Sequence, residues 1–303
     1  MNKKTKIILV IILVIFLGFT IFLFSRTGIA QASKIDERDL KYWNYTSEKI
    51  IQNSEEFEIN GTNETCWLLI HSYTSTPNEM RALANKINSE FGDYVYVPLL
   101  EGHGQVPNKI LNKSLDNWYS QILEDYKLSK KNCEKINVIG SSIGGGIALK
   151  LAEEEDLNNL YLVNPYLFPP YHFYYIFNLN TYLKYTSPIL HYSKKTRLAQ
   201  INDDDGMKNH IAYWNMPFDP MKNSFKFFEE VKLNLDKITE PTLTQQSIND
   251  KASSIESSRI IDKKISSEIK NIITFEKSNH VLLMDYDREE VIANIINFEK
   301  QNR

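Results

Sequence analysis

The sequence predicts an α/β fold in which helices flank a mostly parallel sheet, and three observations support this prediction. Short apolar runs recur along the chain, and helical patterns separate them. The chain has 303 residues, which is long enough for one large globular domain with a sizeable core.

Six apolar runs are predicted to be strands, because each is short and ends in small or turn-forming residues. Runs of this kind are typical of strands that are buried on both faces of a parallel sheet. They cover residues 67–70, 94–99, 136–139, 160–163, 242–246 and 272–275. Helical patterns lie between or after them, at residues 77–91, 115–129, 144–155, 223–235 and 288–300.

One segment, from about residue 166 to 222, breaks this alternation. A structureless loop of that length is uncommon inside a compact domain, so the segment predicts an inserted helical cap. Its first part is rich in aromatic residues, which we expect to be shared between core packing and an acyl-binding wall. These residues are Tyr166, Phe168, Tyr171, Phe173, Tyr174, Tyr175, Phe177, Tyr182 and Tyr185.

The N-terminus has the pattern of a membrane signal anchor. Lys3, Lys4 and Lys6 precede an uninterrupted apolar run over residues 7–24, close to the roughly 20 residues that cross a bilayer as a helix. The positive-inside rule then predicts a single-pass protein: residues 1–24 anchor it, residues 25–46 form a polar linker, and the domain of residues 47–303 lies on the extracytoplasmic side. The alternative is a cleaved signal peptide, because residues 30–32 read Ala-Gln-Ala, and the domain would then be secreted or periplasmic.

Charge and cysteine usage exclude several classes of function. The formal net charge is −3, and Lys and Arg are spread along the chain, so a nucleic-acid partner is not expected. Cys66 and Cys133 are the only cysteines, too few for a disulfide scaffold and without a metal-binding Cys-x-x-Cys spacing. No metal or other cofactor is expected.

Residues 140–144, Gly-Ser-Ser-Ile-Gly, match the G-x-S-x-G pattern between a predicted strand and a predicted helix. In that pattern the central serine, here Ser142, lies on a tight turn that larger neighbours would obstruct. The N-terminus of the following helix also favours developing negative charge. Ser142 is therefore the candidate nucleophile. The alternative is a glycine-rich turn that serves close packing or phosphate binding, although the lysine of a P-loop is missing.

From Cys66 to its C-terminus the chain resembles α/β-hydrolases of the bacterial carboxylesterase, monoacylglycerol lipase and serine aminopeptidase branch. There, an apolar strand ends in His-Gly-aromatic, and residues 68–77, Leu-Leu-Ile-His-Ser-Tyr-Thr-Ser-Thr-Pro, are similar; a Gly-His-Gly follows at residues 102–104. The resemblance implies an oxyanion hole formed by the backbone N–H groups of Tyr73 and Ile143. Ser72 replaces the usual glycine, and a positive φ at this position would strain the hole.

A serine nucleophile needs a base and an orienting carboxylate, which follow it in the order Asp, His in this fold. His280 comes directly after the last predicted strand, where the family has its catalytic histidine, and Asp250 ends the strand before it. Asp236 and Asp285 are weaker candidates for the carboxylate. Among the other histidines, His71 and His103 are expected to hold loops by hydrogen bonds, while His172, His191 and His210 fall in the predicted cap.

These residues predict a serine hydrolase that cleaves carboxylic esters of apolar acyl groups, either small esters or lipids, through an acyl-enzyme. A serine aminopeptidase-like peptidase is one alternative; it needs acidic residues near Ser142 to hold the substrate ammonium, and Asp203, Asp204 and Asp205 offer these only loosely. A membrane-tethered binding protein impaired in catalysis is the other alternative, for which Ser72 is the argument.

The resemblance also bears on the two cysteines. The family's sheet places the strands that follow Cys66 and Cys133 side by side, so both cysteines are expected at the edge away from Ser142. In an oxidising compartment they would form a disulfide, while two buried free thiols are the alternative.

Overall fold

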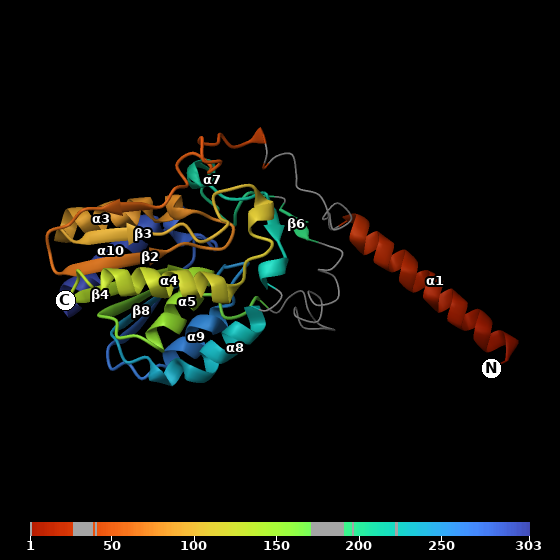
Figure 1. Ribbon diagram of the computed structural model, residues 1–303. Helices are drawn as coiled ribbons and strands as arrows, with labels where there is room; N and C mark the ends of the chain where they lie inside the picture. The colour runs from red at the N-terminus through yellow and green to blue at the C-terminus, as the bar shows by residue number, and fades with distance from the viewer. Residues whose placement is uncertain (1, 27–38, 40, 171–190, 196, 222–223) are drawn as a thin grey trace.

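A seven-stranded sheet forms the centre of the domain, in the order β1-β3-β2-β4-β5-β8-β9 (Figure 1). The computed structural model describes residues 2–26, 39, 41–170, 191–195, 197–221 and 224–303. The strands are β1 (Phe57–Ile59), β2 (Thr65–Ile70), β3 (Tyr94–Val97), β4 (Lys135–Ser141), β5 (Asn159–Val163), β8 (Thr242–Ser247) and β9 (Lys270–Phe275). All pairs are parallel except β1 with β3, so the six predicted strands and the mostly parallel sheet are confirmed.

Helices cover both faces of the sheet, as Figure 1 shows. Side chains of α3 (Arg81–Phe91) and α10 (Arg288–Asn302) pack in the core on one face. Those of α4 (Leu115–Ser129), α5 (Ile143–Ala152), α8 (Ser224–Asn234) and α9 (Ile255–Lys264) pack on the other. Successive residues of β2 alternate between the two, since Trp67 and Leu69 belong to one core and Leu68 and Ile70 to the other. The five predicted helices are confirmed, and α9 was not predicted.

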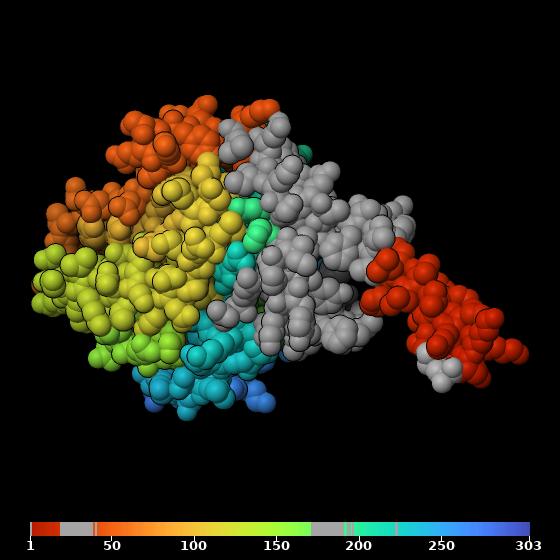
Figure 2. Space-filling model, turned by 45° about the vertical axis from the view of Figure 1, so that its right-hand side comes forward, coloured from red at the N-terminus to blue at the C-terminus, as the bar shows by residue number. Residues whose placement is uncertain are grey.

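Short elements complete the described chain. They are the 3-10 turns η2 (Pro77–Met80), η3 (Pro107–Lys109), η5 (Asp219–Met221), η6 (Leu235–Lys237) and η7 (Leu282–Met284), the strands β6 (Tyr192–Lys194) and β7 (Asn215–Pro217), and the helix α7 (Asp204–Asn209). In the space-filling view of Figure 2, the yellow-green surface that includes α4 lies above the cyan surface of α8.

The predicted helical cap at residues 166–222 is described only in part, because residues 171–190 lie outside the described residues. With them lie His172 and the aromatic residues from Tyr171 to Tyr185. In the described remainder, β6 and β7 form a two-stranded antiparallel sheet, and α7 is a helix of 6 residues. Tyr166 packs on Phe228 of α8, with 5.2 Å between the ring centroids, so this ring contributes to the core.

The N-terminal apolar run forms a helix, α1 (Lys3–Arg26), but the predicted membrane crossing is not supported. Across the described residues, no helix combines the length and the apolar character that a crossing requires. The candidate cleavage site at residues 30–32 lies outside the described residues.

The folded domain begins before residue 47, where the predicted linker ends. Asp39 is fully buried, at 0% exposure, and its carboxylate accepts hydrogen bonds from the backbone N–H groups of Trp214 (2.7 Å) and Asn215 (2.9 Å). The hydroxyl of Tyr45 donates to the carbonyl of Asp39, and Tyr45 forms a β-bridge with Ile51. Asp39 and Tyr45, which fall within the predicted linker, therefore pack against the domain.

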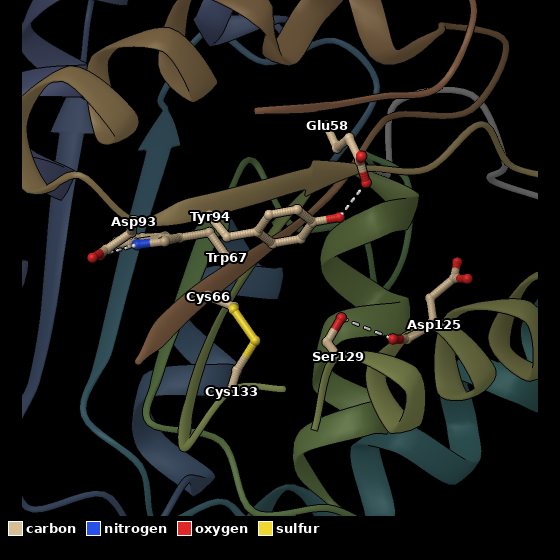
Figure 3. Close-up of a disulfide and its surroundings, with 8 residues drawn as sticks. All are labelled: Glu58, Cys66, Trp67, Asp93, Tyr94, Asp125, Ser129 and Cys133. Carbon is tan, nitrogen blue, oxygen red and sulfur yellow. Dashed lines mark hydrogen bonds between the residues drawn. A yellow bond between two sulfur atoms is a disulfide. The ribbon is translucent and has the colours of Figure 1, made fainter. Parts of the chain in front are cut away.

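Cys66 and Cys133 form a disulfide, with 5.9 Å between their Cα atoms (Figure 3). Cys66 lies near the start of β2, and Cys133 precedes β4, the neighbouring strand. Close by, the indole N–H of Trp67 donates to the buried carboxylate of Asp93 at 2.9 Å (Figure 3). The disulfide, which the sequence left open against two free thiols, therefore joins two adjacent strands at the ends where they begin.

Candidate active site

Ser142 lies on the sharp turn between β4 and α5, where its backbone has φ 55° and ψ −118°. This conformation is strained for a residue with a side chain, and such strain is concentrated at functional sites. The flanking glycines have a steric reason. A Cβ at Gly140 would lie 2.3 Å from the carbonyl oxygen of Gly144, and one at Gly144 would lie 2.4 Å from that of Ile70. Strand, turn and helix are thus arranged as the motif predicts.

The structure brings Ser142, His280 and Asp250 into one chain of hydrogen bonds. The Oγ of Ser142 lies 2.7 Å from Nε2 of His280, whose Nδ1 lies 2.7 Å from Oδ2 of Asp250. Because a carboxylate only accepts, Nδ1 carries the hydrogen and Nε2 is left to accept from the serine hydroxyl. The other oxygen of Asp250 accepts from the N–H groups of Ala252 (2.7 Å) and Ser253 (2.8 Å), which orients the carboxylate.

Two opposing influences set the basicity of His280. Burial acts to lower its pKa, but the negative charge of Asp250 and the hydrogen bond to it outweigh burial, and Glu79 adds to their effect. The pKa of His280 is therefore raised above its ordinary value. The charge of Lys195 works in the opposite direction, to lower the pKa. The imidazole thus gains affinity for a proton from its two carboxylate neighbours.

The backbone N–H groups of Tyr73 and Ile143 are available to a ligand. Ile143 is the first residue of α5, where a helix leaves its N–H groups without partners within the helix. Within the described residues, neither N–H donates to a protein acceptor. Both residues line the same cavity as Ser142 and His280. An oxyanion hole formed by these two N–H groups remains a prediction, which their position beside one cavity supports.

Ser72 does not strain this loop, so the expected difficulty is not found. The positive φ falls two residues later, at Thr74 (61°), and Ser72 is not among the residues with positive φ. The N–H of Ser72 donates to Glu79 at 2.6 Å, and its hydroxyl lies 2.9 Å from that of Ser141, beside the nucleophile. Ser72 thereby connects the loop to the turn that carries Ser142.

His71 and His103 hold the loops around this site, which confirms their predicted role. Nδ1 of His71 donates to the Ser72 carbonyl (2.9 Å), and Nε2 accepts from the N–H of Leu100 (3.1 Å). Nδ1 of His103 donates to the Leu100 carbonyl (3.2 Å), and Nε2 accepts from the N–H of Thr74 (3.3 Å). Burial lowers the pKa of His71 to about 4, so its ring is neutral at pH 7.

Glu79 was not identified from the sequence. It lies in η2, the 3-10 turn before α3, and is 1% exposed, where its carboxylate accepts from the N–H of Ser72. Burial raises its pKa, while the hydrogen bonds from Ser72 and the charge of His280 act to lower it. An acidic residue in a first helical turn usually stabilises the helix dipole from the surface, so no local pattern separates Glu79 from such residues.

A cavity of about 370 Å³ opens in front of Ser142. Much of its wall is apolar, including Ile143, Met216, Phe218, Met221 and Val281. Of the described residues that line it, Lys195 and Lys251 are charged, His210 and His280 are ionisable, and none is Asp or Glu. An apolar chain with a polar end would fit such a wall.

The weaker acidic candidates lie elsewhere. Asp203 caps α7 and binds Arg288 at 2.7 Å, and Asp205 is exposed. Asp285 accepts from the N–H groups of Asn202 and Asn279, each at 2.8 Å, and thereby holds the segment before His280. Asp236 is exposed. None of them lines the described cavity, so Asp250 is the carboxylate that meets the histidine.

Comparison with known proteins places this geometry in a family. The family described as "Serine aminopeptidase, S33" matches residues 63–287, most of the chain. A carboxylesterase of Bacillus subtilis (strain 168) is 25% identical over 233 residues, which cover 76% of this chain and 90% of that protein. A thermostable monoacylglycerol lipase of Bacillus sp. (strain H-257) is 28% identical over 236 residues, covering 76% and 88%.

Solved structures share the fold. A metagenome-derived lipolytic enzyme from a study of LipS and LipT superimposes with a TM-score of 0.75 at 21% identity and covers 83% of this chain and 99% of its own. The monoacylglycerol lipase of Paleococcus ferrophilus superimposes with a TM-score of 0.69 at 18% identity, covering 82% and 98%. The chain therefore has the α/β-hydrolase fold.

Proposed function

Because the chain belongs to the serine aminopeptidase S33 family of α/β-hydrolases, with esterase and monoacylglycerol lipase relatives, we propose that it is a serine hydrolase. In this proposal it cleaves carboxylic esters of apolar acyl groups through an acyl-enzyme. The observation that carries the proposal is the chain of hydrogen bonds from Ser142 through His280 to Asp250. Ser142 and His280 both line a largely apolar cavity.

The first half of the proposed reaction forms the acyl-enzyme. Ser142 Oγ attacks the ester carbonyl while Nε2 of His280 takes its proton, and Asp250 stabilises the imidazolium that results. The tetrahedral oxyanion accepts hydrogen bonds from the N–H groups of Tyr73 and Ile143, each worth roughly 2.7–4 kcal/mol in serine hydrolases. His280 then gives the proton to the departing alcohol.

The second half repeats these steps with water. His280 takes a proton from a water molecule, the water oxygen attacks the acyl carbon, and the carboxylic acid leaves as Ser142 regains its hydrogen. The sum is one ester and one water converted to one acid and one alcohol. Every proton in this sequence passes through Nε2 of His280.

Ester cleavage fits the cavity better than removal of an N-terminal amino acid from a peptide. An aminopeptidase must hold a substrate ammonium, and the described residues that line the cavity include two lysines and no carboxylate. The argument for an impaired binding protein also loses its basis, because Ser72 has no positive φ. Ester hydrolysis is therefore the function that we favour.

Labelling with a fluorophosphonate and hydrolysis of 4-nitrophenyl acyl esters test this function together. The wild type should be labelled and should hydrolyse the esters. Ser142→Ala should abolish labelling and lower kcat by about 10⁶-fold, since the whole triad acts through the serine. Ser89→Ala, at an exposed position of α3, is the matched control and should retain both. Equal ester hydrolysis by Ser142→Ala would contradict the proposal.

We also propose that the domain works in an oxidising compartment. The Cys66–Cys133 disulfide supports this, because reducing compartments keep such thiols free. Alkylation of the protein in intact cells, with and without reductant, followed by mass measurement, tests the proposal. Alkylation of both cysteines without reductant would argue against it.

A further inference from the structure

One end of the cavity carries a cation that ester hydrolysis itself does not use. Lys195 lines the cavity together with Ser142 and His280. Its ammonium donates hydrogen bonds to Oγ1 of Thr74 (2.7 Å) and to the carbonyl of Leu198 (3.2 Å). Lys195 is only partly exposed, so its charge has a defined position instead of moving freely in solvent.

Thr74 fixes this position relative to the reacting centre. Its N–H donates to His103 at 3.3 Å, and its carbonyl accepts from the N–H of Tyr213 at 2.9 Å. Thr74 follows Tyr73, whose N–H is one of the two donors placed for the oxyanion. The ammonium of Lys195 therefore lies beside the loop that would hold the ester carbonyl.

The charge of the Lys195 ammonium affects the pKa values of ionisable side chains near it. The charge of Lys195 acts to lower the pKa of both His280 and His210. Burial lowers the pKa of Lys195 itself to about 8, while the charge of Asp39 acts in the opposite direction. Lys195 is therefore still mainly charged at pH 7. Asp39 does not line the described cavity; its carboxylate holds backbone N–H groups of Trp214 and Asn215.

His210 adds unused hydrogen-bonding capacity to the same end of the cavity. It lines the cavity and is 1% exposed, and burial lowers its pKa to about 3, so the ring is neutral. Its Nδ1 has no hydrogen-bond partner among the described residues. Buried polar atoms are nearly always paired in folded proteins, so this nitrogen is available to a group that enters the cavity.

We propose that the substrate carries a carboxylate in addition to its ester and that Lys195 binds this carboxylate. This inference rests on the proposed ester hydrolysis. A carboxylate pairs with a partly desolvated ammonium through short, charge-assisted hydrogen bonds, whereas a substrate ammonium would be repelled by the lysine and an apolar group would make no such bonds. The apolar side chains of Met216, Phe218 and Met221 suit the chain between the two groups.

Paired substrates of equal chain length test the proposal. The 4-nitrophenyl monoesters of adipic and suberic acid are compared with 4-nitrophenyl hexanoate and octanoate, which have a methyl group in place of the carboxylate. The wild type should have the higher kcat/KM for the acid-bearing member of at least one pair. In Lys195→Met, the ratio of the two kcat/KM values should fall by about 10- to 100-fold, mainly through KM of the acid-bearing ester.

Three further variants identify the lysine. Lys195→Arg keeps the charge and should retain most of the ratio. Lys226→Met, on α8 with a side chain that is 84% exposed, should leave the ratio unchanged. If Lys251→Met lowers the ratio and Lys195→Met does not, the assignment to Lys195 is wrong.

If Lys195→Met does not fold, the kcat/KM values of the wild type for the four esters still test whether the enzyme prefers a substrate with a carboxylate. Higher kcat/KM for both neutral esters would overturn this inference and leave the proposed function intact. Failure to hydrolyse any of the four esters, together with failure of Ser142 to react with a fluorophosphonate, would instead overturn the proposed function.

Discussion

His280 is affected by two carboxylates, and only one of them was visible in the sequence. Asp250 bonds to it directly, while Glu79 acts through space. Together they raise the pKa of His280 although burial acts against them. In the proposed mechanism the raised pKa makes the imidazole a stronger base. It also means that the imidazole becomes protonated, and therefore inactive as a base, at a higher pH.

The first prediction follows from that shift. The base must be neutral to accept the proton of Ser142, so kcat/KM should fall as the pH decreases through the pKa of His280. Because this pKa is raised, the acid limb of the profile should lie above the ordinary histidine value of about 6.5. A profile of kcat/KM against pH measures it, and an acid limb below that value would contradict the shift.

Glu79→Gln separates the charge of Glu79 from its hydrogen bond. The amide oxygen can still accept from the N–H of Ser72, but the negative charge is lost, so the acid limb should move to lower pH. Glu268→Gln, at an exposed position, is the control and should leave the profile in place. An unchanged profile for Glu79→Gln would mean that the carboxyl is neutral throughout the range.

The sequence identified the residues of the site that a local motif marks. Ser142, His280 and Asp250 each follow a strand in the order that the fold requires, and the structure brings them together. Glu79 and Lys195 were missed because what matters about them is burial and proximity, which depend on contacts far along the chain. The contact of Lys195 with Thr74, for example, joins residues 121 positions apart.

At the scale of elements, the turn between β4 and α5 is tightly packed against β2. The second prediction concerns Gly144→Ala, whose Cβ would lie 2.4 Å from the carbonyl oxygen of Ile70 and 2.8 Å from that of His71. Neither backbone atom can move without shifting the loop that begins there, so stability should fall by about 1–3 kcal/mol or more, with loss of activity. Thermal unfolding and ester hydrolysis measure the two effects.

Gly145→Ala is the matched control, since the added Cβ would lie 3.1 Å from its nearest atoms, in Pro165. That contact is relieved by a small shift, so the effect on stability and activity should be clearly smaller. An equal loss in both variants would indicate that helix packing, and not the approach to β2, requires the glycine.

The third prediction, also at the scale of elements, concerns the disulfide. It closes a loop over a sequence separation of 67, for which loop-closure entropy predicts a stabilisation of about 4 kcal/mol. Cys66→Ser with Cys133→Ser should lower the free energy of unfolding by roughly 2–4 kcal/mol. Denaturant unfolding of the variant and the oxidised wild type measures the difference, and equal midpoints would show that the bond adds nothing to stability.

Element types were predicted well where a run was long and uniform. The six parallel strands have short apolar runs, and helices cover both faces of their sheet. The short strands β1, β6 and β7 have 3 residues each, too few for a periodic pattern, and their pairing depends on segments distant in sequence. The helix α9 was missed because polar residues fill much of its sequence, Ile-Glu-Ser-Ser-Arg-Ile-Ile-Asp-Lys-Lys.

For the whole molecule, the boundary of the folded unit differs from the one that composition suggested. Residues 25–46 are polar and were predicted as a linker, yet Asp39 is buried against β7, the strand that includes Met216 of the cavity wall. A polar residue is buried where its hydrogen bonds are satisfied, and only the tertiary structure shows those partners.

The fourth prediction tests this boundary. A chain that begins at residue 47 lacks Asp39, so the backbone N–H groups of Trp214 and Asn215 lose their acceptor and the charge of Lys195 loses its neighbour. Its free energy of unfolding should be lower by about 2–4 kcal/mol than that of a chain that begins at residue 27. Thermal unfolding of both chains is the measurement, and equal stability would restrict the domain to residues 47–303.

The disulfide also bears on the site at the opposite end of the same two strands. β2 pairs with β4 from Thr65 beside Lys135 to Ile70 beside Gly140, and the chain then continues to Tyr73 after one strand and to Ser142 after the other. A slip of one residue between the strands would displace one against the other by about 3.3 Å and turn its side chains to the other face. The Cys66–Cys133 disulfide, near the start of this pairing, excludes such a slip. The separation between the nucleophile and the N–H of Tyr73 is then set by the register of the two strands before any substrate binds.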